Sequence, residues 1–162
     1  MTIQNIVMLL TGMTSALMAG LFFFWSITIM PGMQKLNDLH YVEAMQNFNR
    51  EILHPAFYII FIGSVILLPV ATYLEWRHGV SEKFWLLLSA TLIYLGGVIL
   101  VTALGNVPLN NELEIFNIKK SAPEAFKAVR ENFESAWNRL NWIRTFSSFA
   151  SLILVLIAIV KK

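Results

Sequence analysis

The sequence contains no cysteine, and only 14% of its 162 residues carry a charge. Without thiols the chain has no disulfide, no thiolate nucleophile and no cysteine-ligated metal site. Three His, with no close pair on one helix face, are too few for a typical zinc, di-iron or haem site, so no metal is expected. The net charge of +2 comes without a basic block, which argues against nucleic acid as a partner.

Apolar residues, by contrast, make up 57% of the chain. They concentrate in four runs, at about 3–30, 55–74, 84–106 and 141–160, and each approaches or exceeds the roughly 20 residues that carry a helix across hydrocarbon. Lipid offers the backbone no hydrogen-bond partners, so each run is expected to be helical. The sequence therefore predicts one all-α domain, residues 1–162, built as a four-transmembrane-helix bundle.

Small residues recur every four positions in the first run, at Gly12, Ala16 and Gly20. This spacing predicts a helical face that packs closely inside the bundle. Pro31, followed by a glycine, is expected to stop the first helix. Residues 33–53 then repeat apolar side chains at steps of three and four, which predicts an amphipathic extramembrane helix leading into the second run.

The second long connection is expected to be helical as well. Asn106 and its neighbours are expected to interrupt the third helix, with Pro108 in the first turn of a short helix after it. Ser121 and Glu124 fit a capping box. From Pro123 onward there is no further Gly or Pro, so the fourth helix is expected to begin outside the bilayer and run unbroken into the last run.

The membrane orientation is inferred from basic residues in short connections. Arg77 and Lys83 flank the short second turn, and Lys161 and Lys162 end the chain. The two long connections hold more basic residues, but they also carry many acids and are expected to fold. We therefore expect an integral protein of a bacterial inner membrane with both termini in the cytoplasm.

Polar residues gather at one end of the runs. Counting spans places His54, Asn106, Asn141 and Arg144 on the same side of the bilayer. Trp137 shares a helical stripe with Asn141 and Arg144, at steps of four and three. Arg144 has two interpretations: its side chain snorkels to headgroups, or it faces inward and binds an anion or an oxygen ligand. The shared stripe favours the inward orientation.

The other polar residues also allow two interpretations. His54 precedes Pro55 at a helix N-terminus, where the helix dipole favours neutral imidazole, so it is either a proton acceptor or a helix cap. Asn106 either caps a helix or orients a substrate oxygen. Trp25 either lines a pocket for a flat ring or packs between helices.

A resemblance to a known family rests on motifs that keep their order along nearly the whole chain. These motifs are Gly20-Leu21-Phe22-Phe23, Met30-Pro31, Asn49, His54-Pro55, Asn106-Val107-Pro108-Leu109-Asn110, Trp137-Asn138, Asn141 and Arg144-Thr145. The chain resembles the DUF1772 family of small four-span membrane proteins, which includes the anthrone oxygenases of fungal polyketide pathways.

The resemblance implies a cofactor-independent oxygenation of a lipophilic anthrone-like or quinol-like aromatic. A base removes an acidic C–H proton, and the carbanion then reacts with dioxygen. On this sequence the base would be His54, and the enolate oxygen would be held by Asn106, Asn110, Asn141 and Arg144. The remaining substrate-binding residues would be Asn49, Trp137, Asn138 and Trp25.

Two other functions remain open at the level of the sequence. One is a non-enzymatic binder or carrier that holds a polar head with Arg144 and an apolar tail within the bundle. The other is a structural membrane subunit whose polar groups only join helices. The expected partners are the lipid bilayer and a lipophilic small molecule, and the oligomeric state, including a homo-oligomer, is left open.

Overall fold

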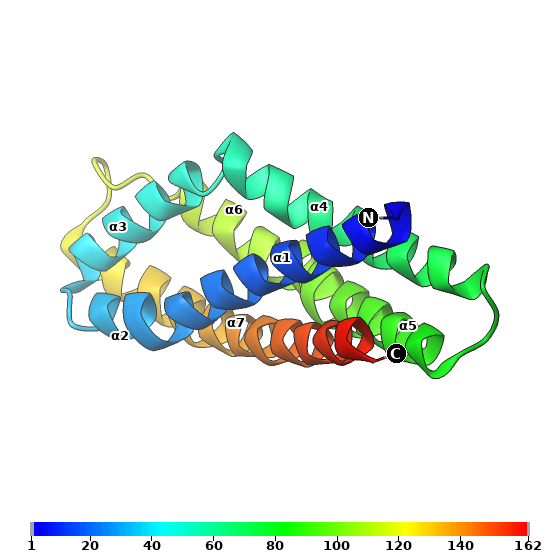
Figure 1. Ribbon diagram of the computed structural model, residues 1–162. Coiled ribbons are helices and arrows are strands. Elements are labelled where there is room, and N and C mark those ends of the chain that lie inside the picture. The colour runs from blue at the N-terminus through cyan, green and yellow to red at the C-terminus, as the bar shows by residue number, and fades with distance from the viewer. Residues whose placement is uncertain (1, 162) are drawn as a thin grey trace.

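A computed structural model describes residues 2–161, and within that range the chain folds entirely into helices and their connections (Figure 1). Met1 and Lys162, the latter used above for the orientation, lie outside the described residues. Four helical rods are long and apolar enough to cross a membrane, which confirms the four-span helical bundle. The rods are Ile3–Met33, Pro55–Trp76, Glu82–Ile115 and Pro123–Val160.

Two of these rods pass through π-helical turns. The first consists of α1 (Ile3–Phe24), η1 (Trp25–Ile29) and α2 (Met30–Met33). The third consists of α5 (Glu82–Tyr94), η2 (Leu95–Leu100), η3 (Thr102–Asn106) and α6 (Val107–Ile115). The second rod is α4 (Pro55–Trp76) and the fourth is α7 (Pro123–Val160). The 38 residues of α7 exceed the roughly 20 that cross hydrocarbon, as expected of a helix that extends beyond the bilayer.

The predicted interruption around Asn106 is wrong, because the third rod continues through it to Ile115. The first rod passes Pro31 but ends at Met33, two residues after the predicted stop. Each proline follows a π-helical segment, with Pro31 after η1 and Pro108 after η3. Proline has no N–H and its ring crowds the carbonyl four residues earlier, so a wider turn at that carbonyl accommodates it. The π-helical turns therefore keep both helices continuous at the level of the polar residues.

The membrane bundle is closed by α1 and α5, each of which packs against both α4 and α7. Its core is a cluster of buried apolar side chains that includes Met18, Leu68, Leu87 and Val155. Polar side chains add links between helices, such as the 2.9 Å bond between the hydroxyls of Thr72 and Thr91. Such hydrogen bonds are satisfied within protein because lipid offers no alternative partner.

The expected small-residue face of the first helix is also wrong. Gly12 is buried, but Ala16 and Gly20 are exposed, and the buried face of α1 instead carries Thr11, Ser15, Met18 and Phe22. A strict four-residue repeat drifts around a helix of 3.6 residues per turn, whereas alternating steps of four and three follow it. The buried stripe therefore follows the second pattern.

Outside the bilayer, α3 (Asp38–Glu51), α6 and the first half of α7 form a second layer, which we call the extramembrane layer. Tyr41, Met45, Leu113 and Phe133 are among the buried side chains of its core. Burial raises the pKa of the Tyr41 phenol above its ordinary range, so this hydroxyl stays neutral. The prediction of amphipathic extramembrane helices is confirmed.

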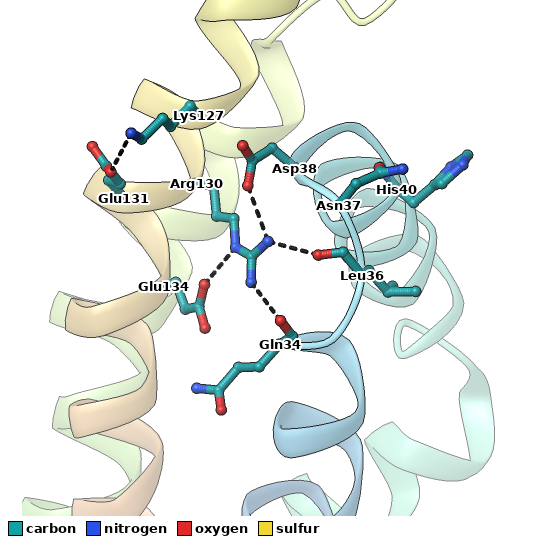
Figure 2. Close-up of polar contacts among 9 residues, drawn as sticks. All are labelled: Gln34, Leu36, Asn37, Asp38, His40, Lys127, Arg130, Glu131 and Glu134. Atoms are coloured by element: carbon teal, nitrogen blue, oxygen red, sulfur yellow. Dashed lines mark hydrogen bonds and ion pairs between the residues drawn. The ribbon is translucent and has the colours of Figure 1, made fainter.

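Arg130 on α7 ties this layer together (Figure 2). Its guanidinium donates to the backbone oxygens of Leu36 at 2.8 Å and Gln34 at 3.0 Å, in the loop that precedes α3. It also donates to the carboxylates of Asp38 at 3.0 Å and Glu134 at 2.7 Å. Because one planar fork makes all four contacts, the start of α3 is fixed on α7.

The capping box predicted for α7 does not form. The N-cap is Ala122, one residue later than expected, because Pro123 is favoured at the first helical position. The Ser121 hydroxyl instead donates to the backbone oxygen of Asn117 at 2.7 Å, closing the preceding turn.

Candidate functional site

A cavity of about 410 Å³ lies where the membrane bundle meets the extramembrane layer. Its lining comes from α1, η1, α3, the start of α4, η3, α6 and α7, so every helical rod contributes to it. The walls are mainly apolar, with polar side chains at a few positions. A cavity of this size and character suits a small lipophilic molecule with a few polar groups.

Arg144 lies in the wall of this cavity and is only 8% exposed. Its guanidinium carbon lies 4.7 Å from the centre of the Phe22 ring and 5.3 Å from that of Trp137. The guanidinium donates to Asn141 Oδ1 at 2.7 Å and to Thr102 Oγ1 at 3.4 Å. Within residues 2–161 no carboxylate forms an ion pair with it. The cavity wall therefore carries a buried cation whose neighbours are neutral.

Asn141 is held in one orientation by a chain of hydroxyl groups. Its amide nitrogen donates to Ser26 Oγ at 2.8 Å, and Ser26 in turn lies 3.0 Å from the Thr145 hydroxyl. Because the amide nitrogen is used by Ser26, the amide oxygen is left to accept from Arg144. Ser26 lies in η1, so the π-helical turn of the first rod supports the site.

Several polar atoms among the lining residues are buried and have no hydrogen-bond partner within residues 2–161. They are Arg144 Nε, Asn106 Oδ1, Asn49 Nδ2 and Trp25 Nε1. An unpaired buried polar group costs about 1–3 kcal/mol, so native structures rarely keep several together without a ligand or water nearby. The concentration of these atoms around one cavity favours a binding role for it.

Two asparagines in the lining contact Trp137. Asn106 donates through Nδ2 to the backbone oxygen of Trp137 at 3.4 Å. Asn110 Oδ1 accepts the Trp137 indole N–H at 2.7 Å. Trp137 is 4% exposed and its ring lies 6.1 Å from that of Trp25. Asn110 therefore fixes the orientation of an aromatic wall, whereas Asn138 is not among the lining residues.

His54 occupies the position expected for a helix cap. It is the N-cap of α4, and its Nδ1 accepts the backbone N–H of Ala56 at 3.2 Å. The imidazole is exposed and is not among the cavity lining, although Leu53 beside it is. In a neutral imidazole one nitrogen accepts and the other carries the proton, so this bond occupies the only free lone pair. The structure thus brings the carboxamides and the guanidinium together, but not the imidazole.

Several lining residues were not predicted from the sequence. Thr102, a hydrogen-bond partner of Arg144, lies one helical turn before Asn106 and could have been found from that spacing. Arg50 on α3 and Glu114 on α6 form an ion pair of 2.7 Å at the cavity. No local pattern predicted this pair, because its residues are 64 positions apart. In the described part of the chain, no three His, Asp or Glu side chains lie close enough to share a metal ion.

Comparison with known protein families identifies a match. The family model described as anthrone oxygenase matches residues 55–154, which is more than half of the chain. The matched segment includes Asn106, Trp137, Asn141 and Arg144, but not Trp25. Searches of curated proteins and of solved structures found no match. Together with its four apolar helices, this match establishes that the chain is an integral membrane protein of the anthrone oxygenase family, as the resemblance indicated.

Proposed function

We propose that this protein is a membrane-embedded oxygenase that acts on a lipophilic anthrone-like or quinol-like aromatic without a cofactor. The observation that carries the proposal is the buried Arg144 guanidinium, which lines an apolar cavity and has no carboxylate partner within residues 2–161. A buried cation without a counter-ion is unfavourable by several kcal/mol, and an anionic ligand removes that cost.

In this proposal Arg144 and the neighbouring amides stabilise an enolate oxygen. The anthrone keto group becomes an enolate when a proton leaves the carbon opposite it, and negative charge then develops on the oxygen. Arg144 N–H groups stabilise that charge in a site from which water is largely excluded. Asn141 and Ser26 keep the guanidinium in place, and Trp137 contributes to the aromatic wall of the cavity.

The overall reaction consumes one dioxygen per substrate. The base takes the acidic proton and leaves a carbanion, which transfers electrons to dioxygen and forms a C–O bond at the same carbon. The proton then returns from the base to the terminal peroxide oxygen. Loss of water from the resulting hydroperoxide then leaves a carbonyl. Anthrone and dioxygen thus yield anthraquinone and water, with the substrate supplying all four electrons.

The proton acceptor has two candidates. His54, the base expected from the resemblance, lies next to the lining residue Leu53, but it can accept a proton at Nδ1 only by releasing the Ala56 N–H. Of the lining residues that the structure describes, Glu114 alone carries a carboxylate. Its position in the cavity favours Glu114, and His54 then serves as the cap of α4.

The proposed location and orientation are supported by the basic residues Arg77, Lys83 and Lys161 at the ends of the second, third and fourth runs. We propose that the protein lies in a bacterial inner membrane with both termini in the cytoplasm, which puts the cavity at the opposite face. Fusion of a cytoplasm-active reporter and a periplasm-active reporter to the C-terminus tests this orientation, because only one of the two fusions becomes active.

Oxygen consumption by the purified protein with anthrone tests the activity. The expected result is dioxygen uptake with formation of anthraquinone above the spontaneous rate, reduced to that rate in Arg144→Met. A carrier is the second candidate, since the same cavity would hold an amphipathic ligand. Anthrone binding under argon without accelerated turnover in air would support the carrier and contradict the oxygenase.

A further inference from the structure

The cavity has an opening marked by lining residues that are also exposed. One edge belongs to residues 48–53 and includes Phe48, 36% exposed, and Leu53, 58% exposed. The other edge is a face of α6 on which Val107, Asn111 and Glu114 follow at steps of four and three. Val107 is 42% exposed. The opening therefore lies between the α3–α4 corner and α6.

The end of this opening that faces away from the bilayer is bridged by polar contacts. Arg50 and Glu114 pair across it. Gln46, which is 4% exposed, donates from α3 to the backbone oxygens of Leu113 at 2.8 Å and Phe116 at 2.9 Å. These contacts tie α3 to α6, so the cavity is covered on the side that faces water.

The other end of the opening is apolar and lies at the level of the membrane spans. Phe57 is in the first turn of α4, and Thr102 is within the apolar part of the third rod. Among the residues described, α4 packs against α5, but it has no extensive contact with η2, η3 or α6. The second and third rods thus separate towards the cavity, and apolar side chains line both sides of the gap between them.

We propose that the cavity exchanges its ligand with the lipid bilayer through a lateral portal between Leu53 and Phe57 on one side and Thr102 and Val107 on the other. The identity of the ligand rests on the proposed function, but the portal does not. A lipophilic aromatic concentrates in the bilayer, so an opening at that level meets it at high local concentration. The Arg50–Glu114 pair then separates the cavity from water.

The protein's own tryptophans can report on the portal. Of the five Trp residues, Trp25 and Trp137 line the cavity, and Trp76, Trp85 and Trp142 are exposed elsewhere. Replacing the three exposed residues with Phe leaves only the two cavity tryptophans. In nanodiscs made with lipids brominated on their acyl chains, the portal predicts quenching of this emission, whereas iodide in the aqueous phase quenches weakly.

A matched pair of variants tests the route. Val107→Phe fills the portal and is expected to at least halve the quenching by brominated lipid. Leu104→Phe adds the same ring at a position that is 77% exposed and outside the lining, and is expected to leave the quenching unchanged. Arg50→Ala removes the ion pair at the end of the opening that faces away from the bilayer. This variant is expected to increase iodide quenching without reducing quenching by brominated lipid.

Equal effects of Val107→Phe and Leu104→Phe on the quenching would overturn the portal. So would iodide quenching as strong as quenching by brominated lipid in the protein that retains Arg50. The assay contains neither substrate nor turnover. A failed portal therefore leaves the oxygen-consumption result intact, and an inactive protein with a working portal contradicts only the proposed oxygenase.

Discussion

Asn141 and Arg144, three residues apart on α7, meet through an N–H···O bond of 2.7 Å from the guanidinium to the carboxamide oxygen. The carboxamide supplies an acceptor but no negative charge. Because Ser26 accepts from the other end of the same amide, the acceptor stays directed at Arg144. The pair thus orients a buried cation without neutralising it, and this property makes the cavity suited to an anion.

Asn141→Asp is expected to neutralise the positive charge of Arg144 in the cavity wall. The carboxylate would form an ion pair with Arg144 at the position of the present hydrogen bond, so thermal stability should hold or rise. The affinity for the anthrone enolate, measured under argon by quenching of tryptophan emission, should fall about 10- to 100-fold, or ~1.4–2.8 kcal/mol. An Asn141→Asp protein that binds the enolate as tightly as wild type would contradict the role assigned to Arg144.

Arg144→Met is expected to lose the ligand without losing the fold. Removing a buried cation that has no carboxylate partner among the described residues should leave the melting temperature unchanged or higher, whereas charge-assisted hydrogen bonds worth about 1.5–3 kcal/mol disappear from the bound state. Arg139→Met, at an exposed position on the same helix, is the control and should change neither. A purely structural Arg144 would instead give a lower melting temperature and unchanged affinity.

Two substitutions separate the candidate bases. Asn is a good N-cap residue, so His54→Asn should keep α4 stable and retain most of the oxygen consumption. Glu114→Gln should reduce turnover about 100-fold or more, since proton transfer by a positioned side chain contributes about 10²–10⁴. Arg50→Gln breaks the same ion pair and controls for its structural loss. Loss of turnover in a stable His54→Asn protein would assign the base to the imidazole.

Gly97 is a close-approach position between η2 and α7. A Cβ atom there would overlap the Ser147 side chain, so Gly97→Ala is expected to destabilise the protein by about 1–3 kcal/mol. Adding Ser147→Gly removes the overlapping atoms and should restore most of the melting temperature. Gly20→Ala, where a Cβ has open space, should be neutral or slightly stabilising. Equal destabilisation by the two alanines would contradict the packing argument.

The four spans were predictable because the thickness of a bilayer sets the length and apolar content that each run must have. The convergence of Asn106, Asn141 and Arg144 was predictable too, since counting spans places all three on one side. The continuation of the first rod past Pro31 was not predictable. A proline ends most helices, and its accommodation by a π-helical turn depends on packing against other rods.

The position of His54 marks another limit of the sequence. Its neighbour Pro55 correctly indicated a helix start, but whether the imidazole turns towards the cavity or caps the backbone is decided by a single side-chain torsion. The Arg50–Glu114 pair was equally hidden, because only the tertiary fold brings α3 to α6. Periodicity therefore located the helices and the depth of the polar residues. It did not predict where their side chains point or which distant residues they contact.

Arg130 and Arg144 stand on one unbroken helix, α7, 14 residues and therefore about 21 Å apart. A straight helix tilts as one unit. When its membrane half tilts to match a thinner bilayer, the half whose Arg130 binds the loop before α3 is expected to move with it. We therefore expect the thickness of the bilayer to affect the shape of the cavity. Shorter acyl chains should shift the emission of Trp137, and Arg130→Gln, which loosens the grip, should weaken that response.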